Sequence, residues 1–125
     1  MEKVETRISI IEKLNNNIIR VEIKPDIQLE PKDLDENFQA YTQQLNIMSA
    51  YFLLVFKPGG EANVEARIKH AKPERSKIKK AEAIVIETLA HRLGANFYKK
   101  KFKPNHPVEI FTIEKEAKEW LLSIQ

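Results

Sequence analysis

The fold is decided by residues 81–122, which read AEAIVIETLAHRLGANFYKKKFKPNHPVEIFTIEKEAKEWLL. The apolar run at residues 81–87 predicts a buried strand, and helical spacing begins after Thr88, whose hydroxyl suits a helix cap. Residues 108–111 predict a short strand, followed by a closing helix that Thr112 is expected to cap. Because strands separated by helices form parallel crossovers, this order predicts an α/β domain.

The N-terminal part predicts a hairpin, a helix and a central strand. Strands at residues 6–13 and 18–23 flank three asparagines at residues 15–17, which tolerate the left-handed backbone of a turn. Pro31 suits the first position of a helix whose apolar side chains recur at helical spacing up to Leu45. The continuous apolar run at residues 50–56 is typical of a strand covered on both faces.

The remaining apolar positions indicate three more helices. Val64, Ile68 and Ala71 mark a short one that Pro73 ends. The expected inward faces of the last two helices consist of Leu89, Leu93 and Phe97, and of Ile113, Ala117, Trp120, Leu121 and Ile124. The predicted fold is therefore an α/β domain over residues 1–125, with a mixed, mostly parallel sheet of about five strands and four helices. The predicted order is β-β-α-β-α-β-α-β-α.

Length and composition limit the class of protein. A chain of 125 residues can bury a single core without staples. The absence of cysteine excludes disulfides, zinc–thiolate sites and cysteine nucleophiles. The N-terminus lacks the long apolar segment of a signal peptide, and no apolar run reaches the length of a membrane span. We therefore expect a cytoplasmic protein.

Charge is distributed unevenly along the chain. Residues 1–50 carry six Lys/Arg and nine Asp/Glu, a balance of −3, whereas residues 51–125 carry fifteen and nine, a balance of +6. The most basic tract is Lys99-Lys100-Lys101. It is expected to be a solvated helix end, because lysines complement the negative C-terminal end of a helix. A contact with nucleic acid or with an anionic membrane is the alternative.

No set of residues predicts catalysis or metal binding. The three histidines are scattered without paired-ligand spacing, and no serine lies in a nucleophile motif. Gly59-Gly60 follows a buried strand, but no phosphate-binding glycine motif surrounds it, and Glu61 would repel an anion. We therefore expect a protein that is not an enzyme and that has no cofactor, metal site or catalytic residue.

Several packing motifs resemble the SpoIIAA-like family, which has the STAS-type (STAS/SEC14-like) fold. The segment FTIEKEAKEWL at residues 111–121 is similar to the family's closing strand and helix, and Glu65-Ala66-Arg67 and RLGANF at residues 92–97 resemble two further family elements. The resemblance implies a small, non-enzymatic bacterial domain, in a fold group that includes anti-sigma-factor antagonists and lipid-binding relatives. Residues 57–64 contain no Ser or Thr, so the phosphorylation switch of those antagonists does not carry over.

These observations predict a non-catalytic regulatory or interaction module. Its partner is expected to be another protein or a second copy of the chain, with nucleic acid less favoured. The alternative is a carrier of a small apolar or lipid-like ligand, held between helices and sheet. Adjacent glycines leave backbone N–H groups accessible, so the candidate interaction surface consists of Gly59, Gly60, Glu61, Asn63 and Arg67.

Overall fold

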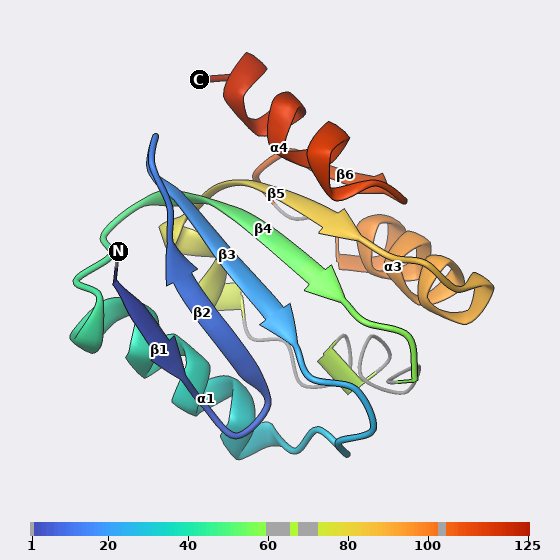
Figure 1. The fold of residues 1–125 in the computed structure, drawn as a ribbon, viewed down its shortest axis with the longest axis horizontal. Coiled ribbons are helices and arrows are strands. Elements are labelled where there is room, and N and C mark those ends of the chain that lie inside the picture. Colours follow the sequence, from blue (N-terminus) through green and yellow to red (C-terminus); the bar gives the residue numbers. More distant parts are fainter. Residues whose placement is uncertain (1, 60–65, 68–72, 103–104) are drawn as a thin grey trace.

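The computed structural model describes residues 2–59, 66–67, 73–102 and 105–125, and it shows one six-stranded sheet (Figure 1). The strands are β1 (Lys3–Glu5), β2 (Ser9–Lys13), β3 (Ile18–Ile23), β4 (Ala50–Phe56), β5 (Lys79–Val85) and β6 (Val108–Phe111). They lie in the sheet in chain order. β2 is antiparallel to both of its neighbours, β1 and β3, and β3 to β6 are parallel.

Helical segments lie between the parallel strands and after the last of them. They are α1 (Pro31–Gln39), the π-helical turn η1 (Ala40–Gln44) that continues it, the 3-10 helix η2 (Pro73–Ile78), α3 (Leu89–Phe102) and α4 (Glu114–Ser123). None of the described helices is long and apolar enough to cross a bilayer.

The α/β class and the mixed sheet are confirmed, but the predicted element count and order are wrong. The sheet has six strands, because Lys3–Glu5 adds an edge strand to β2, and η2 begins at Pro73, where no element was expected. The described residues contain three α-helices. The short helix was predicted from Val64, Ile68 and Ala71, which lie outside the described residues. Ala66 and Arg67, between these positions, are described and are helical.

The predicted hairpin between β2 and β3 forms, although β2 begins at Ser9 and not at Thr6. Asn16 and Asn17 both have positive φ, at 61° and 58°. Two consecutive left-handed residues suit the twist of a tight hairpin turn, and asparagine tolerates that conformation better than most residues. The turn sets the register in which Ile11 pairs with Val21, so that both side chains point to the same face of the sheet.

Helices cover the two faces of the sheet unequally. Val21, Phe52 and Ile84 lie on the larger buried face, where they pack with residues of η1, η2 and α3. Leu53 and Ala83 lie on the opposite face, in a smaller cluster completed by α4. Because α4 contacts β4, β5 and β6, this face is covered over the C-terminal part of the sheet (Figure 1).

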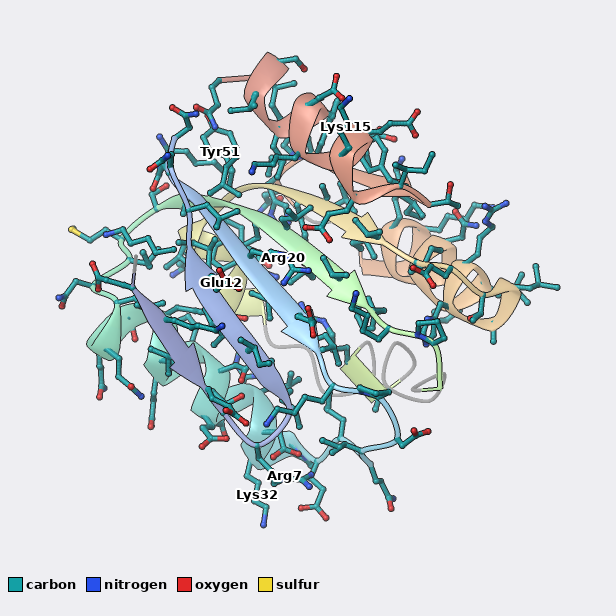
Figure 2. All side chains as sticks on the ribbon, viewed as in Figure 1. Arg7, Glu12, Arg20, Lys32, Tyr51 and Lys115 are labelled. Carbon is teal, nitrogen blue, oxygen red and sulfur yellow. The ribbon has the colours of Figure 1, made fainter. Side chains whose placement is uncertain are left out.

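An ion pair fixes the start of α4 on the sheet. Arg20 of β3 donates to both carboxylate oxygens of Glu114, at 2.7 and 3.0 Å, and to Glu22 at 3.0 Å. Figure 2 shows Arg20 near the middle of the sheet. The bidentate geometry sets the direction from which the helix approaches.

The apolar faces predicted for α3 and α4 are partly wrong. Thr88 does cap α3, since its hydroxyl accepts a hydrogen bond from the His91 amide at 3.1 Å. Thr112 does not cap α4, whose N-cap is Ile113. In α4, Ala117 and Leu121 are buried as predicted and Trp120 is half-buried against Phe111. The predicted inward residues that prove exposed are Leu89, Leu93, Phe97, Ile113 and Ile124.

The turn before β2 is tied to the start of α1. Arg7 donates to both carboxylate oxygens of Asp33, at 2.8 and 2.6 Å, and to the carbonyl of Gln28 (Figure 2). Asp33 also accepts the Glu30 amide at 2.7 Å, which satisfies one of the amides at the helix start. These hydrogen bonds hold the pKa of Asp33 below its ordinary value, against the opposing effect of burial.

We expect Asp33→Asn to lower the melting temperature near pH 7, by a margin that narrows as the pH falls below 3.8 towards pH 3. Because the pKa of Asp33 is lower in the folded state, the ionised side chain stabilises the protein at pH values above its ordinary pKa of 3.8. This contribution is lost as the pH falls through the folded-state pKa. Thermal unfolding of both proteins across this range measures the gap. Glu116→Gln, on an exposed position of α4, is the control. A gap that stays constant down to pH 3 would contradict the role of the Asp33 charge.

Candidate functional site

A buried ionic cluster lies between the larger face of the sheet and its helices. Its centre is Glu82 of β5, whose side chain is 0% exposed. Lys79 Nζ lies 2.9 Å from Glu82 Oε2, and Arg67 Nη2 lies 3.4 Å from the same oxygen. His106 Nε2 lies 3.2 Å from the other carboxylate oxygen. These four residues, Arg67, Lys79, Glu82 and His106, are called the Glu82 cluster.

A local irregularity of the sheet brings Lys79 to Glu82. Ala50 pairs with Lys79 and Tyr51 pairs with Ala81, so Lys80 is an extra residue in β5. Residues three apart in a regular strand point to opposite faces, and one extra residue restores them to the same face. Lys79 thus joins Glu82 on the larger buried face, where its Nζ lies 5.6 Å from the centre of the Phe52 ring.

The Glu82 carboxylate is held in its ionised form. Burial by itself raises the pKa of Glu82, but the Lys79 ammonium, the hydrogen bond with His106 and the Arg67 guanidinium outweigh burial and hold the pKa well below its ordinary range. Burial lowers the pKa of Lys79, and the Glu82 charge limits that fall. A carboxylate stabilised in this way is a poor proton acceptor near neutral pH. The arrangement therefore suits an internal brace better than an acid–base catalyst.

An aromatic pair lies next to the Glu82 cluster. Tyr41 of η1 meets Phe52 of β4 edge-to-face, with ring centres 5.1 Å apart. Burial raises the pKa of Tyr41, and the charge of Arg67 offsets part of that rise. The cluster therefore touches both η1 and the sheet. Among the described residues, no three acidic or histidine side chains come together in a set that could hold a metal ion.

The structure describes only part of the candidate interaction surface. Gly59 has φ of +97°, and a Cβ added there would lie 3.1 Å from a carboxylate oxygen of Asp26, so both backbone and space favour glycine. Gly60, Glu61 and Asn63 lie outside the described residues. The Arg67 side chain is directed at Glu82 and is 17% exposed. A binding role for this loop stays a prediction.

A row of exposed apolar side chains runs along α3. Leu89 is 73% exposed, Leu93 62% and Phe97 52%. They lie four residues apart and so follow one side of the helix. His91 and Ala95, on the opposite side, are 0% exposed and face the protein interior. The three exposed residues Leu89, Leu93 and Phe97 are called the α3 ridge.

The lysine tract lies at the C-terminal end of the same helix. Lys99 pairs with Glu109 of β6 at 3.3 Å, with both side chains well exposed, and Lys100 is exposed. Such surface pairs contribute little to stability. The side chain of Lys101 lies outside the described residues. The basic tract and the α3 ridge thus share one helix.

The Glu82 cluster and the exposure of the α3 ridge were not predicted from the sequence, although each leaves a signal there. Glu82 interrupts an apolar run that was predicted to be buried, and a charge in such a strand requires partners from elsewhere in the chain. The α3 ridge was recognised as an apolar face but assigned to the core. The other side of this helix carries the small residues Gly94 and Ala95. Small residues let a helix pack closely, so they indicate that this other side faces the sheet.

Comparison with known proteins identifies a family and no annotated relative. The search of curated proteins and the search of solved structures each found no match. Residues 12–125, all but the first eleven residues of the chain, match the model of one family, and that model covers the Glu82 cluster and the α3 ridge. The chain therefore belongs to the family described as Domain of unknown function (DUF7793).

Proposed function

We propose that this chain is a non-catalytic interaction module that docks through the α3 ridge. The exposure of the ridge carries the proposal. Single exposed apolar residues are common on protein surfaces, but three large ones in register along one helix side form a stripe. Such stripes are favoured where a surface is covered by a partner.

The Glu82 cluster supports the non-catalytic part of the proposal. Its carboxylate makes close contacts with Lys79 and His106 and a longer one with Arg67, all inside the protein. Groups that act on a substrate need to reach it, whereas Glu82 is fully enclosed. The cluster thus acts as a brace between β5 and the segments around it.

A regulatory role in a bacterial cytoplasm completes the proposal. It is what the resemblance to SpoIIAA-like proteins implies, and the α/β architecture supports that resemblance at the level of fold class. A small apolar ligand has weaker support. The hollow of about 470 Å³ beside the hairpin turn and α4 is lined by Lys13, Leu14, Asn15, Asn16 and Lys118, of which only Leu14 has an apolar side chain.

Site-specific photo-crosslinking tests the proposal. A photoreactive side chain at Leu93 should give discrete cross-linked products in cells that express the chain, because the α3 ridge would be covered by its partner. The same group at Met48, which is 89% exposed and lies outside α3, is the matched control and should give none of these products. Equal labelling at the two positions would contradict docking through α3.

A further inference from the structure

We infer that the partner of the α3 ridge is an anionic lipid surface, which α3 contacts along its length without crossing it. This inference rests on the proposed function, since it names what covers the ridge. It combines the exposed apolar side chains of α3 with the charge of the same helix.

The stretch of sequence that carries the α3 ridge is basic, although Lys99 near its end pairs with Glu109 of β6 at 3.3 Å. No acidic residue occurs between Glu87 and Glu109, whereas this stretch contains five basic residues, namely Arg92, Lys99, Lys100, Lys101 and Lys103. Of these, Arg92, Lys99 and Lys100 have exposed side chains in the structure. Basic side chains near a membrane are attracted by the negative potential of anionic lipids. Acidic side chains, which would be repelled, are missing from this stretch.

The positions of these residues match those of a helix that lies in a membrane interface. Arg92 immediately precedes Leu93, and Lys100 follows Phe97 by three residues, so cationic groups flank the apolar row. Apolar side chains of such helices insert at the boundary of headgroups and acyl chains, while long basic side chains reach the headgroups. Since His91 and Ala95 are already packed inside, α3 can dock without leaving the protein.

Lipid fits this surface better than a protein or a nucleic acid does. The apolar side chains project from the outer side of a helix, and a bilayer accepts projecting groups without a matching groove. The phosphate backbone of a nucleic acid would bind the lysines but would not contact Leu89 and Leu93, the most exposed residues of the α3 ridge. The three apolar residues and the surrounding cations are explained together by an anionic bilayer.

Vesicle flotation with the full chain tests the inference. Vesicles of phosphatidylcholine with about 30% phosphatidylglycerol should bind the protein, and vesicles of phosphatidylcholine alone should bind it at least about tenfold more weakly. Binding to the anionic vesicles should decrease at high salt, because screening weakens the attraction. Failure of the protein to bind the anionic vesicles, or equal binding to both kinds, would overturn the inference.

Two variants and their matched controls assign the binding to α3. Leu93→Ser with Phe97→Ser should reduce binding at least about tenfold, since both side chains would leave the acyl boundary. Arg92→Gln with Lys100→Gln should reduce it by a similar factor, at about fivefold for each charge. The controls are Met48→Ser for exposed apolar area, and Lys115→Gln with Lys118→Gln, on α4, for charge. Lys115 is labelled in Figure 2.

The remaining outcomes separate this inference from the proposed function. Circular dichroism should show the same melting temperature for all variants, because each changed side chain is exposed. Loss of vesicle binding in the controls to the same extent as in the α3 variants would overturn the inference. Cross-linking from Leu93 to proteins alone, or to a second copy of the chain, would overturn it while leaving the interaction module intact. Equal cross-linking at Leu93 and Met48 would reject both.

Discussion

Replacement of Glu82 by alanine is expected to lower the free energy of unfolding by about 3–5 kcal/mol. The substitution removes the carboxylate that Lys79 and His106 contact at 2.9 and 3.2 Å, and leaves the Lys79 ammonium buried beside Arg67 without its counter-charge. An uncompensated buried charge costs several kcal/mol, and the gap left by the side chain adds to that loss. Urea denaturation followed by circular dichroism measures the change.

Two further variants separate charge from packing at the same position. Glu82→Gln keeps the shape but not the charge, so it should also be destabilising. Glu82→Leu combined with Lys79→Met replaces the ion pair with apolar groups of similar size, and buried pairs exchanged in this way are often close to neutral. The double variant should therefore be more stable than Glu82→Ala. A loss below about 1 kcal/mol in Glu82→Ala would show that the cluster is hydrated and is no brace.

Elements specified by neighbouring residues could be predicted from the sequence. The turn at Asn16 and Asn17 depends on the backbone preference of asparagine, which is a property of those residues alone. The central strand β4 was predicted within the bounds that the structure shows, because an uninterrupted apolar run of strand length suits burial on both faces. The cap formed by Thr88 likewise depends on an amide three residues away.

Elements that depend on distant segments could not be predicted in the same way. The edge strand β1 exists because Val4 pairs with Ile11, and three residues carry too little pattern to reveal it. The Glu82 cluster joins residues from the helical turn at Arg67 to His106, so its partners are close only in the folded chain. Sequence distance between the members hides such a cluster.

The α3 ridge shows a different limit of sequence reasoning. Periodicity locates an apolar side of a helix but does not determine which side faces the sheet. In α3 the inward side carries His91 and Ala95, and Leu93 is left outside. The usual rule that the apolar side is buried therefore predicted the wrong face. Departures of this kind are expected at functional surfaces, where burial is completed by a partner.

The second large effect is expected from Phe52→Ala, at about 3–5 kcal/mol of destabilisation. Phe52 is 0% exposed in the central strand β4, where its ring meets Tyr41 edge-to-face and the Lys79 ammonium lies 5.6 Å from its centre. The substitution leaves a cavity and removes both ring contacts. Because Lys79 also belongs to the Glu82 cluster, the losses from Phe52→Ala and Glu82→Ala should not add independently.

Trp120→Ala is the matched control for Phe52→Ala, because it also removes an aromatic side chain, but one that is only partly enclosed. Trp120 is half-buried and has its ring centre 5.8 Å from that of Phe111, so its removal should cost about 1–2 kcal/mol, less than the loss at Phe52. Urea denaturation of the two variants under the same conditions compares them directly. A loss at Trp120 equal to that at Phe52 would mean that Trp120 belongs to the enclosed core, as its helical spacing with Ala117 and Leu121 had predicted. A smaller loss would place the main energetic core on the face of the sheet that carries Phe52, where the Glu82 cluster also lies.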